Sequence, residues 1–309
     1  MKEEAEAAGW NVRIIDPLKL SIVVDDDGGR LLHKGWPIDC DAVIPRIGHS
    51  ITRRGVSVVR AFERMGVIVL NKGDGIQSSR DKLLASQKMN EGGVPIPTTA
   101  QVGTWQDTRR AVSRVGGTPC VIKTNEGTHG SGVFLAHTEQ QARQLVYQML
   151  ERGLRPLVQE YIRESHGQDI RAFVVGGKVV ASMRRKAKGS EFRSNFHLGG
   201  EVEKLSITGE YAEIACKAAE ILGLEIAGVD MLESERGPLV LEVNSSPGLE
   251  GIEAASGVNV ANRIISNLAS LYKSRQEAEE KQLLPRSQGG DEEANCLLYT
   301  SDAADEDLR

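Results

Sequence analysis

Apolar residues in the first quarter of the chain fall into short runs that alternate with polar, helix-forming stretches. Strands are predicted at residues 11–17, 43–48 and 67–71, and helices at 2–9 and 52–65. One-for-one alternation of strands and helices is typical of a parallel sheet with helical crossovers. We therefore expect residues 1–78 to form a small, open α/β domain.

The alternation changes after this region. Ser79 is placed to cap a helix that runs to about Glu91, and GGVPIPTT then forms an extended linker. The remaining pattern predicts helices at 105–115, 139–151 and 209–222, strands in PCVIK, VFLA and LVQEYI, a hairpin at 170–185 that turns at Gly176 and Gly177, and a second hairpin made by IAGVDML and PLVLEVN. Strands and helices no longer follow one for one, which is typical of α+β domains.

The periodic pattern fades beyond about residue 272. Residues 273–309 contain five basic and ten acidic side chains. Their low hydrophobicity predicts a segment that is disordered or foreign to the fold, and from Cys296 onward it resembles vector or assembly read-through. This segment accounts for the whole net charge of −5, since the rest of the chain holds 33 basic and 33 acidic side chains. A neutral body argues against a protein that coats nucleic acid.

The composition narrows the class of protein further. The 309 residues, 40% of them hydrophobic, are enough for two or three units with buried cores. The four cysteines lie far apart, at positions 40, 120, 216 and 296, so neither a zinc site nor a disulfide framework is indicated. No run of about 18 apolar residues occurs, and the N-terminus is acidic. We expect a cytoplasmic protein that neither crosses a membrane nor is secreted.

Three side chains at the second hairpin carry the clearest chemistry. Regular alternation in PLVLEVN places Glu242 and Asn244 on one face with Val240. Antiparallel pairing with IAGVDML places Asp230 on that face, across from Val240 and diagonal to Glu242. Two carboxylates about 4 Å apart repel by about 4 kcal/mol at an effective dielectric constant near 20, so a cation is expected between them. Carboxylate and amide oxygens suit Mg²⁺ shared with phosphate, and the alternative is a polar sheet face that meets water.

A glycine-rich segment, EGTHGSG at residues 126–132, follows the predicted strand PCVIK. Its glycines would let backbone amides approach a polyphosphate, with Ser131 beside them; they are Gly127, Gly130 and Gly132. The segment matches neither the P-loop pattern nor the dinucleotide fingerprint. Because it joins two predicted strands, a flap over phosphates is favoured, and an ordinary flexible hairpin is the alternative.

Two lysines are candidates for contacts with phosphate. Lys123 ends the strand PCVIK, and Lys82 lies on the helix that follows Ser79. Both could point at phosphates beside the glycine-rich segment, although lysines in such positions are more often simply solvated. His129 and His197 have no nucleophile near them in the sequence, so a catalytic triad is not supported.

Basic residues are also concentrated in the first hairpin and the loop after it. Between Arg163 and Arg193 eight basic residues face three acidic ones, which predicts an anion-binding cleft. Arg171 and Arg184, on the two arms of the hairpin, are placed for bidentate contacts with phosphate or carboxylate. The run RRKAK could instead be a surface loop or a nucleic-acid patch, but aromatic residues do not interleave it.

Taken in order, a series of motifs resembles the ATP-grasp ligases, and among them the RimK-type α-L-glutamate ligases. The motifs are RDK (80–82), VIK (121–123), EGTHGSG, VQEYI (158–162), DIRAFVVGGKVVA, FRSN, AGVD and EVNSSPGLEGIE. The resemblance implies an ATP-grasp fold, in which two α+β lobes grip ATP, preceded by a small parallel α/β pre-ATP-grasp domain. The implied units are 1–78 for the pre-ATP-grasp domain, 79–157 for the linker and first lobe, 158–272 for the second lobe with the metal site, and 273–309 for the tail.

The resemblance also implies roles for individual residues. Phosphates of ATP would be bound by Lys82 and Lys123, by the flap from Gly127 to Gly132, and by Arg193, Ser194 and Asn195. Adenine would meet the backbone of Glu160 and Tyr161, and the ribose would lie near Asp169. Two Mg²⁺ or Mn²⁺ ions would be held by Asp230, Glu242 and Asn244.

The implied reaction is the ATP-dependent addition of L-glutamate to the C-terminal carboxylate of a ribosomal small-subunit protein. The carboxylate attacks the γ-phosphate to give an acyl phosphate, and the amine of glutamate then displaces phosphate. We expect Arg184, with Arg171 as second choice, to stabilise the tetrahedral oxyanion, and the flap to keep water from the acyl phosphate. The family suggests a homotetramer, and no direct contact with nucleic acid or membrane is implied.

One feature departs from the family pattern. The pre-ATP-grasp domain of the family opens with a strand and a loop that precede the helix with which this sequence starts. That strand is central in the sheet, so we expect unpaired backbone and an exposed apolar edge in its place. The missing strand motivates one alternative function, a nucleotide-binding module without turnover. A second alternative, independent of that strand, is a related ATP-grasp ligase that acts on an amino-acid-carrier protein or a small-molecule cofactor.

Overall fold

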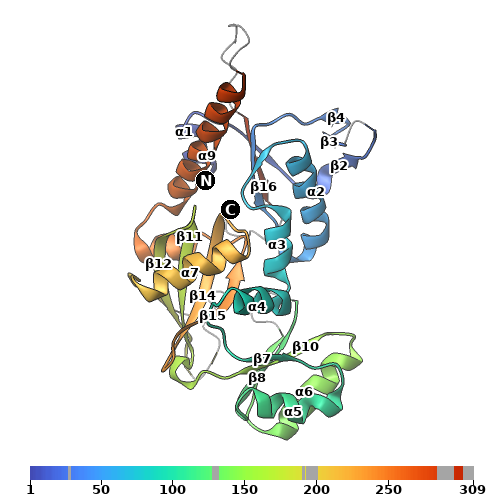
Figure 1. The fold of residues 1–309 in the computed structure, drawn as a ribbon, viewed down its shortest axis with the longest axis vertical. Coiled ribbons are helices and arrows are strands. Elements are labelled where there is room, and N and C mark those ends of the chain that lie inside the picture. Colours follow the sequence, from blue (N-terminus) through green and yellow to red (C-terminus); the bar gives the residue numbers. More distant parts are fainter. Residues whose placement is uncertain (27–28, 127–131, 190–191, 193–200, 284–295, 302–309) are drawn as a thin grey trace.

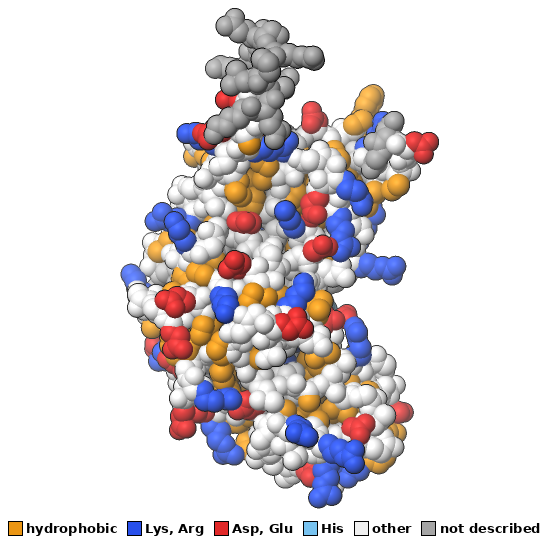
Figure 2. Space-filling model, in the orientation of Figure 1, with side chains coloured by type: hydrophobic (Ala, Val, Ile, Leu, Met, Phe, Trp, Pro, Cys, Tyr) orange, Lys and Arg blue, Asp and Glu red, His pale blue; other side chains and the backbone are white. Residues whose placement is uncertain are grey.

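The computed structural model describes residues 1–26, 29–126, 132–189, 192, 201–283 and 296–301. It arranges the chain as three units along the long axis of the molecule: the N-terminal domain, a central lobe, and a further lobe at the opposite end (Figure 1). Acidic and basic side chains are interspersed over the face shown in Figure 2, as expected for a neutral body. Within the described part of the chain, every helix is too short or too polar to span a bilayer.

The N-terminal domain is built on a four-stranded sheet in the order β1-β16-β5-β6, with all neighbours parallel. Its elements are α1 (Lys2–Ala7), β1 (Asn11–Ile15), β5 (Ala42–Arg46), α2 (Thr52–Arg64), β6 (Ile68–Val69), α3 (Gly73–Arg80) and β16 (Cys296–Ser301). Helix α2 buries Val59 and Phe62 completely against the sheet. The parallel α/β character is as predicted, but a small antiparallel sheet of β2 (Leu20–Val23), β3 (Arg30–His33) and β4 (Trp36–Pro37) was not expected.

The centre of this sheet is filled by a strand from the C-terminal segment. Strand β16 pairs in parallel with β1 on one side and with β5 on the other. Its own residue Leu297 is buried in the hydrophobic core. The prediction that residues 273–309 lie outside the fold is therefore wrong for β16, and also for residues 273–283, which continue helix α9 (Val260–Leu283). The physical reason is that β1 and β5 each offer a row of backbone donors and acceptors, and CLLYTS has residues that suit a strand.

Helix α3 ends and helix α4 (Lys82–Glu91) begins at Asp81. The Asp81 carboxylate accepts a hydrogen bond of 2.9 Å from the amide of Leu84 and so caps α4. Ser79 lies inside α3, where its hydroxyl donates to the carbonyl of Ile76. The prediction that Ser79 caps this helix is thus wrong, because the aspartate two residues later has the extended backbone that a cap requires.

The lobe at the far end, which we call the first lobe, has an antiparallel sheet in the order β7-β10-β8-β9. Its elements are β7 (Thr99–Gln101), α5 (Thr108–Arg114), β8 (Cys120–Thr124), β9 (Val133–Ala136), α6 (Glu139–Glu151) and β10 (Pro156–Glu160). Helices α5 and α6 pack together against the sheet, with Ala142 and Val146 of α6 fully buried beside Ile122. This core contains no residue from the other two units.

The central unit, which we call the second lobe, has a five-stranded antiparallel sheet in the order β13-β12-β11-β14-β15. Its elements are β11 (Gln168–Val175), β12 (Lys178–Lys186), β13 (Glu201–Lys204), α7 (Glu210–Ile221), β14 (Ile226–Ser234), β15 (Gly237–Asn244) and α8 (Glu250–Ser256). Helix α7 covers one face, and α8 and α9 cover part of the other. Gly176 and Gly177 form the tight turn between β11 and β12, with φ of +55° and +73°.

The N-terminal domain is fixed to the second lobe by apolar packing and by one buried amide. Ile44 and Leu70 share a core cluster with Phe173 and Ile264. The side chain of Asn71, 1% exposed, donates to the carbonyls of Ile226 and Ser245 and accepts from the amide of Ile226. These two units therefore present a common, rigid platform to the first lobe.

Candidate active site

Strands β14 and β15 bring the predicted oxygen ligands together. Asp230 lies directly opposite Glu242, and the register shifts by one residue after Asp230, so that Leu241 is an extra residue in β15. This bulge turns Val240 toward α7, where it is buried, so the prediction that Val240 shares the face of Glu242 is wrong. The bulge also brings the two carboxylates from a diagonal to a directly opposed position, with Asn244 two pairs further along on the same face.

Asp230 is buried and held by two arginines. Arg171 makes a bidentate contact, with both N–H···O distances 2.7 Å, and Arg185 adds a contact of 2.9 Å. Burial opposes ionisation of Asp230, but the two guanidinium groups outweigh it and hold the pKa of Asp230 below its usual value. The amide of Asn244 lies 3.4 Å from the same carboxylate. The predicted ligand is therefore an ionised carboxylate within a network of charges.

Arg185 joins this network to Asp169. Its guanidinium donates to both oxygens of Asp169, each at 2.6 Å, and both side chains are nearly inaccessible to solvent. Burial disfavours the charged form of Arg185, yet Asp230 and Asp169 raise its pKa above the usual value. Asp169 was expected near the ribose of ATP. Arg185 engages both oxygens of Asp169, and the Asp169 side chain is 4% exposed, so the ribose contact stays a prediction.

Arg184 lies on the opposite face of the sheet. It pairs across the hairpin with Ile170 and contacts the carboxylate of Glu233 and the amide oxygen of Gln168. The expectation that Arg184 lies in the site is therefore wrong, and its neighbour Arg185 is there instead. A place on one arm of the hairpin does not determine the face of the sheet. The register shifts between Phe173 and Val174, so one more residue separates the arginines from the turn than in regular pairing, and Arg185 faces the site.

Lys123 and Lys82 approach the carboxylates from the first lobe and its linker. Burial, and secondly the charge of Lys82, lower the pKa of Lys123 to about 8, whereas Glu242 opposes the shift. These three groups thus lie within electrostatic range of one another. Asn125, 2% exposed, fixes the two lysines relative to each other: its side chain accepts from the amide of Leu83, and its carbonyl accepts from the amide of Lys82.

Glu160 and Tyr161 lie where β10 ends and the chain passes to the second lobe. The amide of Glu160 donates to the carbonyl of Thr98, and its carboxylate accepts from the amide of Thr98 and from Arg236. Burial opposes ionisation, but Arg236 and Thr98 keep the pKa of Glu160 below its usual value. The side chain of Glu160 therefore ties this connection to both lobes. An adenine contact through the backbone stays a prediction.

The other expected phosphate contacts are Gly127, Gly130, Ser131, Arg193, Ser194 and Asn195, and together with His129 and His197 they lie outside the described residues. Gly132, the last residue of the glycine-rich segment, is described. Its φ is +82°, and a Cβ there would meet the hydroxyl of Thr124 at 3.2 Å. Glycine therefore suits this position by conformation and by space.

The donor set of the second lobe fits a hard divalent cation. A carboxylate has about four acceptor positions, and among the described residues the Oδ2 atom of Asp230 is engaged by Arg171, Arg185 and Asn244, whereas Oδ1 accepts only from Arg171. Room remains for one cation contact, and Glu242 and Asn244 add oxygens beside it. In the described part of the chain no three His, Cys, Asp or Glu side chains gather around one point. A bound ion would therefore complete its shell with the amide and with phosphate or water oxygens.

Comparison with protein families assigns nearly the whole chain up to residue 268. The model of the RimK pre-ATP-grasp domain matches residues 1–76, and that of the RimK-like ATP-grasp domain matches residues 79–268. A protein of Aeromonas salmonicida named "Probable alpha-L-glutamate ligase" is 47% identical over 267 residues, which are 86% of this chain and 90% of that protein. A protein of the same name from Legionella pneumophila is 47% identical over 275 residues, or 88% and 91% of the two chains.

Solved structures show the same fold at lower identity. The ATP-grasp ligase PsnB, in complex with a minimal precursor, Mg and ADP, superposes with a TM-score of 0.66 at 18% identity, over 88% of this chain and 92% of that one. The architecture in Figure 1 is thus that of an ATP-grasp enzyme with its preceding domain.

Proposed function

Because this chain belongs to the RimK-like ATP-grasp family and is an ATP-dependent ligase, we propose that it joins L-glutamate to the C-terminal carboxylate of a protein or peptide. Relatives that share 47% of its residues over most of the chain carry the name alpha-L-glutamate ligase, which supports glutamate as the incoming amino acid. The ribosomal small-subunit protein implied by the family resemblance is the first acceptor to test.

The proposal rests on side chains of opposite charge that face each other between the lobes. Lys123 and Lys82 lie on one side, and Glu242 with Asp230 lies on the other. Phosphate oxygens of ATP would be attracted to the lysines, and a divalent cation to the carboxylates. This polarity favours a metal-bound polyphosphate over an uncharged ligand.

Asp230, Glu242 and Asn244 are the residues that would hold Mg²⁺, two ions being the number that the family resemblance implies and Mn²⁺ a possible substitute. When bound, Mg²⁺ supplies positive charge next to the phosphate oxygens. Arg171 and Arg185 keep Asp230 ionised and in place, so the site is arranged before any ligand arrives.

The reaction has two steps. An acceptor carboxylate oxygen bonds to the γ-phosphorus of ATP while the bond to the bridging oxygen of ADP breaks. The amine nitrogen of glutamate then bonds to the acyl carbon, phosphate leaves with the bonding electrons, and the amine loses a proton to solvent. Lys82 and Lys123 would orient the phosphates, and Arg171 with Arg185, in place of Arg184, would stabilise negative charge on the transferred groups.

The test is a mass-spectrometric ladder. Acceptor peptides that end in Glu are incubated with ATP, Mg²⁺ and each of the twenty amino acids in turn. We expect successive additions of glutamate alone, with release of ADP, and no addition by Glu242→Ala or Asn244→Ala. Glu233→Gln is the matched control, because Glu233 lies on the other face of the same sheet and holds Arg184. ATP consumption without a ladder on any amino acid would refute the assignment of glutamate, and equal ladders in Glu242→Ala would refute the site.

The family resemblance also suggests a homotetramer. Sedimentation velocity at micromolar concentration tests this directly, and a monomer would contradict it.

A further inference from the structure

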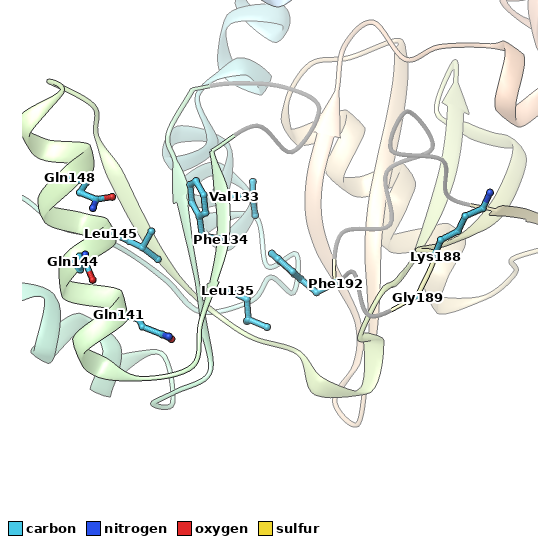
Figure 3. A pocket seen from close by; sticks show the side chains of 10 residues that line it. All are labelled: Val133, Phe134, Leu135, Gln141, Gln144, Leu145, Gln148, Lys188, Gly189 and Phe192. Atoms are coloured by element: carbon cyan, nitrogen blue, oxygen red, sulfur yellow. The ribbon is translucent and has the colours of Figure 1, made fainter.

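A groove of about 920 Å³ lies between the β9 edge of the first lobe and the residues that follow β12 (Figure 3). Strand β9 forms its floor, one face of helix α6 forms one wall, and residues that follow β12 lie across from it. The lining side chains are those of Val133, Phe134, Leu135, Gln141, Gln144, Leu145, Gln148, Lys188 and Phe192, together with Gly189. Phe134 is 43% exposed, which is unusual for an aromatic side chain on a strand.

Among the described strands, β9 lies at the edge of its sheet, next to β8 alone, and some of its backbone groups face this groove. The amide of Thr124 donates to the carbonyl of Gly132 at 3.2 Å, so these two residues form a hydrogen-bonded pair with β8. Because such pairs alternate along an antiparallel ladder, Ile122 and Phe134 form the next one. The N–H and C=O groups of Val133 and Leu135 therefore point away from β8, toward the open side, where a peptide strand could pair with them.

The direction of β9 determines which end of an added strand would reach the site. Val133, its first residue, pairs with Lys123, whereas Ala136, its last, pairs with Cys120, further from the phosphate-binding lysines. An antiparallel guest strand runs from the Ala136 end to the Val133 end. Its C-terminus would thus arrive beside Lys123, whereas a parallel guest would present its N-terminus there.

We propose that the acceptor's C-terminal tail binds as an antiparallel strand on the free edge of β9, with its terminal carboxylate delivered to Lys123. This inference rests on the proposed function, since it assumes a carboxylate acceptor. Four residues of β9 span about 13 Å at 3.3 Å per residue, so a tail of at least five or six residues is needed to use the whole edge.

The lining of the groove indicates what kind of tail it accepts. Among the described residues that line it, Lys188 is the charged one and none is acidic. Glutamines at positions 141, 144 and 148 of α6 offer amide donors and acceptors along one helix face. An acidic tail, including one already extended by glutamate, would therefore meet a cation and hydrogen-bond donors, with Phe134 and Leu145 as apolar contacts.

Leu135→Pro tests the edge directly. Proline removes the N–H that faces the groove but no bond to β8, a position at which edge strands tolerate proline. We expect the KM of an eight-residue acceptor ending in Glu-Glu to rise about fivefold, the value of one net hydrogen bond, with kcat unchanged. The dipeptide Glu-Glu, too short to lie along β9, should be used equally by both proteins. Gln101→Pro is the matched control, because Gln101 has its N–H on the opposite edge of the same sheet.

Hydrogen exchange separates failure of this inference from failure of the proposed function. The eight-residue peptide, added to the ADP-bound protein, should protect the amides of Val133 and Leu135 and leave that of Gln101 unchanged. If the wild-type protein extends the peptide but Leu135→Pro has the wild-type KM and no protection occurs at β9, the groove is not the acceptor site. If the wild-type protein extends no acceptor, the proposed function itself fails.

A second variant tests the chemistry of the groove. Lys188→Gln should lower the preference for an octapeptide with internal Glu over one with internal Gln by about threefold, an effect of the size that exposed charge pairs produce. An unchanged preference would contradict the assignment of Lys188 to acidic tails.

Discussion

Replacement of Arg185 by alanine should destabilise the protein far more than the same replacement of Arg184. The two residues are neighbours in β12 but lie on opposite faces of the sheet. Arg185 holds Asp169 through two contacts of 2.6 Å and Asp230 through one of 2.9 Å, and its side chain is 5% exposed. Arg184 contacts Glu233, whose side chain is 40% exposed.

The expected magnitudes follow from burial. Removal of Arg185 leaves Asp169 as a buried carboxylate without its bidentate partner, and loss of one member of a buried pair costs about 3–5 kcal/mol. The Arg184 contact is screened by solvent, so its loss should cost about 1 kcal/mol or less. Arg185→Lys should recover part of the difference, since a lysine restores the charge but not the bidentate geometry.

Urea unfolding at neutral pH, followed by circular dichroism, measures these differences. The double variant Arg185→Ala with Asp169→Asn is the internal check, because the amide removes the buried charge and should recover much of the loss. If Arg184→Ala and Arg185→Ala lower the free energy of unfolding equally, the assignment of the two arginines to opposite faces is refuted.

Two further predictions concern single groups, and a third concerns the C-terminal strand. The affinity for ADP, measured without divalent ion, should fall by up to about tenfold per pH unit above pH 8, because Lys123, with a pKa of about 8, is then uncharged in the free protein; Lys123→Arg should abolish this slope, and a persistent slope would contradict the role of Lys123. Burial raises the pKa of the Cys120 thiol to about 11, so iodoacetamide at pH 8 should leave Cys120 unmodified in the folded protein and label it in urea, as mass spectrometry would show. A chain that ends at Leu283 lacks β16, so amides of β1 and β5 that pair with it should exchange hydrogen faster while those of β8 stay unchanged; equal exchange in β1 and β5 would show that β16 does not stabilise this sheet.

Much of the fold was predictable because its elements are periodic. The helix of residues 52–65, the hairpin at Gly176 and Gly177, and the strand VFLA all lie within two residues of their predicted bounds. The resemblance to ATP-grasp ligases also named the ligase family to which the chain belongs. Local patterns suffice to predict a helix or strand where no β-bulge interrupts its regular repeat.

Two bulges, each of one extra residue, determine which side chains face the site. The bulge in β12 exchanges the faces of Arg184 and Arg185, and the bulge at Leu241 moves Val240 away from Glu242. Strand parity counts residues from the turn, so one unpaired residue reverses every assignment beyond it. Bulges depend on packing against the partner strands and have no clear sequence signal here. Arg184 was chosen for its place on an arm of the hairpin, and Arg185 was missed although its cross-strand partner Asp169 had been singled out.

The tail was misjudged for a different reason. Composition predicts whether a segment can fold by itself, whereas β16 is ordered by two strands more than 250 residues away in the sequence. Pairing with strands that are distant in the sequence depends on the backbone donors and acceptors that β1 and β5 offer. It does not depend on the hydrophobicity of the added segment.

The separate core of the first lobe has a consequence for how such an enzyme diversifies. The wall of the groove formed by β9 and α6 belongs to the same packing unit as the cluster around Val146, while Asp230, Glu242 and Arg185 lie on the sheet of the second lobe. Substitutions in distant, separately packed units contribute nearly additively to stability. Residues such as Gln144 and Gln148 are therefore free to change with the acceptor while the phosphoryl-transfer machinery is preserved, so new substrate ranges are accessible to mutation without a loss of the chemistry.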